Sequence, residues 1–122
     1  MATQKLTLVE NAFDTLEHAI SHLNAMPKAP TAGTFKRIIL DLSHVAELLF
    51  KERLRQIHPA FILSDVDKYP SATAHTVTAA DALRRLQRIG EVEFTEADQS
   101  ALKTIREKRN EIEHYEFSID AT

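Results

Sequence analysis

The sequence predicts an all-α fold, an up-and-down four-helix bundle that forms a single domain over residues 1–122. Apolar residues recur at steps of three and four along most of the chain, which is the period of an amphipathic helix. Only two glycines and four prolines are present, and this shortage disfavours β folds, which need many tight turns. A chain of 122 residues is long enough to bury a core of its own.

Two long helices are predicted in the first half of the chain. The first begins at a capping box formed by Thr7 and Glu10. Its apolar stripe is expected to face the core and consists of Leu6, Val9, Phe13, Leu16, Ile20 and Leu23. The second is expected to begin near residue 31 or 34 and to end before Pro59, because the residue preceding a proline avoids helical angles.

The connection from 59 to 77 is irregular, with room for an extra short helix. It is either a plain link or a flap beside a functional site. A third helix is expected after Thr78, which forms a capping pair with Asp81, and Gly90 is its expected stop. The residues expected to face inward from this helix are Ala82, Leu86 and Ile89.

The fourth helix is expected to begin at the capping pair Thr95 and Asp98 and to run to about Tyr115. Its buried seam is predicted to consist of Leu102, Ile105 and Ile112. On the third helix, the basic stretch 84–88 is interpreted as a solvated face, with contact to an RNA backbone as the alternative.

Composition excludes several classes of function. The chain has no cysteine, so it has no disulfide, no thiolate metal site and no cysteine nucleophile. Its two glycines cannot form a glycine-rich phosphate loop. The net charge is −3, so any contact with nucleic acid has to come from a local patch. No apolar run is long enough to span a membrane and no signal peptide is visible, so a cytoplasmic protein without membrane contact is expected.

The end of the fourth helix carries the residues with chemical potential. At about 100° per residue, Arg106, Arg109, Asn110, Glu113 and His114 share one face of this helix. Arginine holds two phosphate oxygens at once and keeps its charge, while histidine exchanges protons near neutral pH. RNA supplies its own nucleophile, the 2′-hydroxyl, so this set of residues suits metal-free RNA cleavage. A second pair with the same spacing, Arg53 and His58, stops at a helix-breaking proline and is interpreted as accidental.

The sequence Arg109-Asn110-x-x-x-His114 resembles the signature of the HEPN superfamily, which consists of small helical bundles with this motif on a late helix. The stretch Glu47-Leu48-Leu49-Phe50-Lys51 is similar to a segment common in the same superfamily. The length and order of the predicted helices also look like this fold.

The resemblance implies a metal-independent endoribonuclease with a toxin, phage-defence or RNA-processing role, acting as a homodimer on RNA and without a cofactor or metal. It implies that Arg109 binds the scissile phosphate, that His114 is the general acid or base, and that Asn110 orients one of them. An antitoxin protein is a possible partner. In one toxin branch the histidine is followed two residues later by a tyrosine that is modified; here Tyr115 directly follows His114, which puts such a modification in doubt.

Supporting residues are expected around this motif. Arg106 adds positive charge, and Tyr115 adjoins His114. Glu47 and Lys51 are either a helical ion pair or a support in which Glu47 orients Arg109 or His114.

Two alternative functions remain open. In a non-catalytic protein- or nucleotide-binding module of the same fold, Arg109 would pair with Glu113 and an apolar patch would be exposed elsewhere. In a metal-binding bundle, carboxylates and imidazoles would converge, and the expected set is Asp41, His44, Glu47, Glu111 and His114. His18 and His22 lie four apart but outside the predicted apolar stripe, so both are expected to be exposed.

Overall fold

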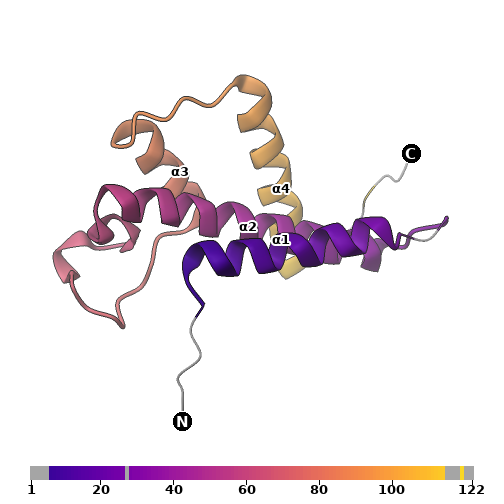
Figure 1. Cartoon of the computed structure of the whole chain (residues 1–122). Helices are drawn as coiled ribbons and strands as arrows, with labels where there is room; N and C mark the ends of the chain where they lie inside the picture. The colour runs from indigo at the N-terminus through magenta and orange to yellow at the C-terminus, as the bar shows by residue number, and fades with distance from the viewer. Residues whose placement is uncertain (1–5, 27, 115–118, 120–122) are drawn as a thin grey trace, which may run out of the picture. The chain divides into compact units, whose positions relative to one another are not determined.

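The computed structural model describes residues 6–26, 28–114 and 119, and all regular secondary structure in these ranges is helical. Four α-helices follow one another along the chain (Figure 1): α1 (Leu8–Asn24), α2 (Ala32–Ile57), α3 (Ala79–Arg88) and α4 (Glu96–His114). The connection between α2 and α3 contains two short 3-10 helices, η1 (Pro59–Ile62) and η2 (Val66–Lys68). The all-α prediction is confirmed. The HEPN-type bundle arrangement stays a prediction.

The chain divides into two compact units, each built from two separate stretches. The first combines the chain up to Ala12 with Ala46–Phe94, and the second combines Phe13–Val45 with the chain from Thr95 onward. Both α1 and α2 contribute residues to each unit. The predicted single domain over residues 1–122 stays a prediction.

The core of the first unit lies where the C-terminal half of α2 meets α3. Leu54 is fully buried there with Val77, Ala82 and Leu86. Partly buried side chains surround this cluster, namely those of Phe50, Phe61, Ile62, Val92 and Phe94. An isolated antiparallel bridge between Leu63 and Thr76 pairs the two ends of the irregular connection with each other.

The predicted helix starts are confirmed by side-chain caps. The hydroxyl of Thr78 accepts a hydrogen bond from the backbone N–H of Asp81 at 3.2 Å. At the start of α4, Thr95 and Asp98 bond each other's backbone N–H groups, at 3.1 and 3.3 Å. Thr7 accepts from the N–H of Glu10 at 3.1 Å. Each cap satisfies a donor that the first helical turn leaves without an intrahelical partner.

The predicted inward face of α1 is only partly correct, since Val9 and Leu16 are half buried but the other members of the stripe are exposed. Phe13 is 61% exposed, and Ile20 and Leu23 are about half exposed. The side chains that are buried on this helix are those of Ala12 and Ala19, seven residues apart. Small side chains allow a neighbouring element to approach closely, so the inward face is rotated from the stripe that the large apolar residues indicate.

Two further packing predictions need correction at the ends of α3 and α4. Ile89 is 45% exposed because it caps the end of α3 and lies beyond its last buried turn. The predicted seam of α4 is only half buried, and none of its described residues is fully buried. Gly90 follows the end of α3, as predicted. A glycine is required there because a Cβ atom would lie only 2.9 Å from the carbonyl oxygen of Leu86. The neighbouring Glu91 adopts the positive φ of 53°.

Candidate functional site

Arg109 and His114 lie at the C-terminal end of α4 and share a contact with one carboxylate. Arg109 Nη2 is 3.2 Å from Glu113 Oε1, and His114 Nε2 is 3.9 Å from Glu113 Oε2. The side chain of His114 is 67% exposed. The spacing of four residues places Arg109 next to Glu113 on one side of the helix. Glu113 and His114 are consecutive residues, and their longer separation of 3.9 Å is a looser contact. Glu113 therefore lies between the two groups proposed for phosphate chemistry.

The helical segment around Arg109, Glu113 and His114 has no net charge. Asn110 and Arg106 are exposed on the same helix. Lys108 forms an ion pair with Glu111 at 3.2 Å. From residue 106 to 114 the helix carries three basic and three acidic side chains, so its formal charge with neutral histidine is zero. Tyr115 lies outside the described residues.

Glu47 and Lys51 form the helical ion pair that was one of their two interpretations. Lys51 Nζ is 3.5 Å from Glu47 Oε1 and donates a hydrogen bond to Thr76 Oγ1 at 2.9 Å. Lys51 thereby links α2 to the segment before α3. These contacts lie within the first unit, whereas Arg109 and His114 belong to the second. The role of Glu47 in orienting them stays a prediction.

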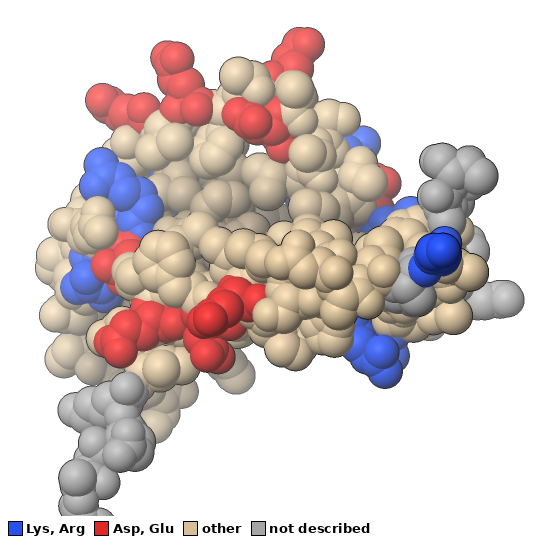
Figure 2. All heavy atoms as spheres, turned by 45° about the vertical axis from the view of Figure 1, so that its right-hand side comes forward, with Lys and Arg blue, Asp and Glu red and all other residues tan. Residues whose placement is uncertain are grey.

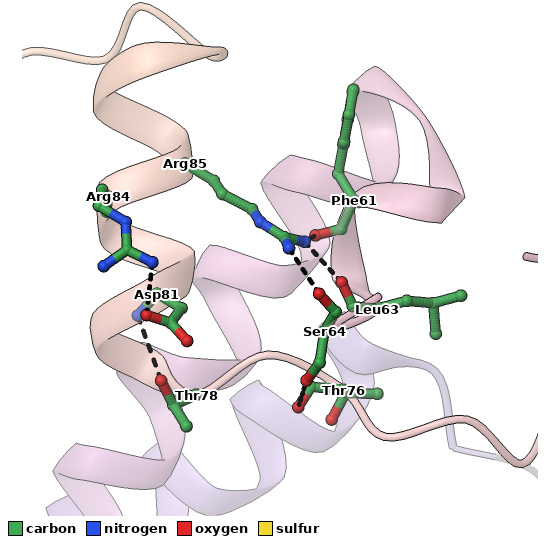
Figure 3. A network of polar contacts seen from close by, with 8 residues as sticks. All are labelled: Phe61, Leu63, Ser64, Thr76, Thr78, Asp81, Arg84 and Arg85. Carbon is green, nitrogen blue, oxygen red and sulfur yellow. Dashed lines mark hydrogen bonds and ion pairs between the residues drawn. The ribbon is translucent and has the colours of Figure 1, made fainter. Parts of the chain in front are cut away.

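The basic stretch of α3 has a structural role at its central arginine (Figure 3). Arg85 Nη1 donates to the carbonyl oxygens of Phe61 and Leu63, both at 2.6 Å, and Nη2 donates to that of Ser64 at 3.1 Å. Arg84 pairs with Asp81 at 2.7 Å. The guanidinium of Arg85 is therefore committed to the backbone of the irregular connection, which argues against its binding an RNA backbone.

Arg53 and His58, the pair whose spacing was interpreted as accidental, each make a local contact. Arg53 donates to Gln56 at 3.1 Å. His58 caps η1, since its Nδ1 accepts from the backbone N–H of Ala60 at 3.0 Å. The two side chains make different local contacts, so these contacts do not join them in one site despite the shared spacing.

An ion pair that the sequence did not reveal, between the buried Glu52 and the half-exposed Arg55, lies near the start of α1. Glu52 accepts two hydrogen bonds from Arg55, at 2.6 and 2.9 Å. These hydrogen bonds are the main cause that lowers the pKa of Glu52 below its ordinary value of 4.5, against desolvation, which raises it. The same hydrogen bonds raise the pKa of Arg55. The pair borders a cavity of about 470 Å³ that is also lined by Thr7, Leu8 and Val9.

The cluster of possible metal ligands differs from the expected set. Among the described residues, His18, His22 and Asp41 offer ligand atoms that all lie within 4.8 Å of one another. His18 is exposed as expected, but His22 is half buried, which corrects the expectation for it. Asp41 contacts His18 in this cluster. Of the set expected for a metal-binding bundle, namely Asp41, His44, Glu47, Glu111 and His114, this cluster contains only Asp41.

On the face shown in Figure 2, Lys and Arg side chains occur in small separate groups, and several Asp and Glu side chains form groups of their own. Within the described residues, none of the helices combines the length and apolar character that a membrane span requires.

Compared with known proteins, the chain matches no family model, no curated protein and no solved structure. The HEPN resemblance therefore depends on the residues of the motif and on the all-α fold.

Proposed function

We propose that this protein is a metal-independent endoribonuclease of the HEPN type, with a toxin, phage-defence or RNA-processing role. The observation that carries the proposal is the exposed trio on the last turns of α4. It presents a guanidinium and an imidazole within about one helical turn, both in contact with Glu113. A phosphate group approaching this face meets a cation and a proton-transfer group together.

In the proposed reaction, Arg109 binds two non-bridging oxygens of the scissile phosphate and stabilises the charge that develops on them. The 2′-oxygen forms a bond to phosphorus, and the bond from phosphorus to the 5′-oxygen breaks. One imidazole accepts the proton of the 2′-hydroxyl, and a protonated imidazole donates a proton to the leaving 5′-oxygen. A homodimer would supply His114 twice for these two roles. The products end in a 2′,3′-cyclic phosphate and a 5′-hydroxyl.

Glu113 has a defined place in this proposal. It holds Arg109 in the absence of RNA, and the phosphate has to replace its carboxylate. An exposed pair with this spacing contributes only about 0.3–0.5 kcal/mol, so a phosphate bound by two hydrogen bonds can displace it. The ion pair is therefore compatible with a working site, and Asn110 on the same face is available to orient the phosphate.

The test incubates the full chain with a labelled RNA pool in excess EDTA, next to Arg109→Ala and His114→Ala. Arg84→Ala and His75→Ala are matched controls, because both residues are exposed and lie outside the motif. We expect cleavage with cyclic-phosphate ends by the wild type and by both controls, and none by the motif variants. Circular dichroism checks that each variant is folded. Cleavage that persists in His114→Ala would refute the assignment.

A non-catalytic binding module is the second candidate, favoured by two observations. Arg109 is already held by Glu113, and Phe13, Ile20 and Leu23 leave apolar surface exposed on α1. Such surface is typical of a partner-binding site. A folded wild type that leaves every RNA intact would favour this candidate, and Phe13→Asp would then be expected to abolish partner binding while Arg109→Ala leaves it unchanged.

A further inference from the structure

We propose that His18, His22 and Asp41 form a site for a divalent transition-metal ion, with Zn²⁺ as the representative ion. The site lies within the second unit, on α1 and α2. It is independent of the reaction proposed for α4, which uses no metal.

The spacing on α1 places both imidazoles on one side of the helix. His18 and His22 are four residues apart, which is the arrangement by which two histidines on one helix bind a single zinc ion. Their rings lie edge to face with centroids 4.4 Å apart. The two Nε2 atoms are 3.2 Å apart and face each other.

This distance fits an ion held between the two nitrogens. Zinc binds imidazole nitrogen at about 2.0–2.1 Å. Two nitrogens 3.2 Å apart then subtend an angle of about 100° at the ion, which is close to the tetrahedral value. The helix therefore sets the two nitrogens at a separation suited to chelation, and the rings turn so that both electron pairs point at the ion.

Asp41, on α2, does not bind the ion directly but orients His18, one of the two histidine ligands. Its Oδ2 lies 2.7 Å from Nδ1 of His18. A carboxylate that accepts the Nδ1–H of a histidine fixes the orientation of the ring and leaves a free electron pair on Nε2. Asp41 is only 19% exposed at its side chain, so it is well placed to hold the ring of His18.

The electron pair on Nε2 of His18 has a different partner in the metal-free and the metal-bound protein. In the metal-free protein, the Nε2–H of His22 donates to His18 Nε2. In the metal-bound protein, His22 carries its proton on Nδ1 and both Nε2 atoms bind the ion. Because His18 is 61% exposed at its side chain, water can fill the remaining coordination positions. Imidazole ligands select Zn²⁺, Co²⁺, Ni²⁺ or Cu²⁺ over Mg²⁺ and Ca²⁺, which prefer oxygen ligands.

The experiment titrates the metal-stripped full chain with ZnCl₂ in competition with a chromogenic chelator. We expect one Zn²⁺ per chain for the wild type, loss of this binding in His18→Gln and His22→Gln, and about 10- to 100-fold weaker binding in Asp41→Asn. His75→Gln, which removes an exposed histidine from the first unit, is expected to bind like the wild type. MgCl₂ is expected not to compete.

A second measurement keeps the result interpretable if a variant is unstable. Excess Zn²⁺ should raise the melting temperature of the wild type and of His75→Gln but leave that of folded His22→Gln unchanged, because only a ligand bound to the native state stabilises it. Absence of Zn²⁺ binding by the wild type would overturn the proposal. Equal binding by the wild type and His22→Gln would overturn it as well, because the ion would then be held elsewhere.

Discussion

Replacing Arg85 with methionine tests whether the basic stretch of α3 acts in folding. Methionine keeps an apolar stem of similar length but removes three hydrogen bonds to the carbonyl oxygens of Phe61, Leu63 and Ser64. A hydrogen bond to a charged group contributes about 1.5–3 kcal/mol. The bond to Ser64 is exposed and the other two are half buried, so we count two bonds at about 1.5 kcal/mol each. The expected loss is about 3 kcal/mol in the free energy of unfolding.

Urea unfolding followed by circular dichroism measures this loss, and a thermal scan should show a melting temperature lower by about 10 °C. Arg84→Met is the matched control, because it makes the same change one residue earlier in an exposed pair with Asp81. We expect it to cost less than about 0.5 kcal/mol. Equal losses in the two variants, or a loss below 0.5 kcal/mol in Arg85→Met, would refute the structural role of Arg85.

Three further predictions concern the core, the ion pair of Glu52 with Arg55, and the motif. Leu54→Ala should lower the free energy of unfolding by about 2–5 kcal/mol in urea, because Leu54 is fully buried; a smaller loss would contradict the packing. Because Arg55 lowers the pKa of Glu52, this stabilisation is complete above pH 4.5 and is lost as the pH falls through the folded-state pKa. Urea midpoints between pH 6 and 3 should therefore decline more steeply in the wild type than in Glu52→Gln, and parallel declines would exclude the effect. Glu113→Gln should lower the KM for RNA by up to about twofold, since the phosphate no longer displaces a carboxylate from Arg109; steady-state cleavage measures this, and a raised KM would contradict it.

The features that the sequence predicted well are local ones. The caps at Thr78 and Thr95 depend on side chains that reach a backbone N–H three residues away. The end of α2 follows from the backbone restriction that Pro59 imposes. The ion pair of Glu47 and Lys51 also needs only the helical repeat. Such features require no knowledge of which elements meet.

The inward face of α1 depended on packing, and there the sequence pattern was misleading. Large apolar side chains marked a stripe through Phe13 and Ile20, whereas the buried side chains are those of Ala12 and Ala19. Alanine contributes little to an apolar pattern but permits close approach. The face through Ala12 and Ala19 continues to His22, three residues after Ala19, which explains why His22 is half buried.

The contact between His18 and Asp41 could not be found from the sequence for the same reason. The two residues are 23 positions apart, and their meeting depends on how α1 and α2 align. A rotation of α1 by one residue turns a side chain by about 100° around the helix axis, which is enough to separate the imidazole from the carboxylate. An error in the inward face thus also conceals the polar cluster. The pair Glu52 and Arg55 is local in sequence, but the burial of Glu52 depends on packing in the same way.

The proposed metal site and the proposed RNA-cleavage site on α4 should respond differently to EDTA and to single histidine substitutions. One set of samples can therefore test the two sites separately. Cleavage by Arg109 and His114 should survive EDTA, because phosphate binding and proton transfer use only side chains. Zn²⁺ binding should disappear in His22→Gln while cleavage continues, and cleavage should disappear in His114→Ala while Zn²⁺ binding continues. If His22→Gln abolished both in a folded protein, the ion would have to take part in the reaction, and the metal-free mechanism would be wrong. If His114→Ala abolished both, His114 itself would have to ligate the ion, and the assignment to His18 and His22 would be wrong.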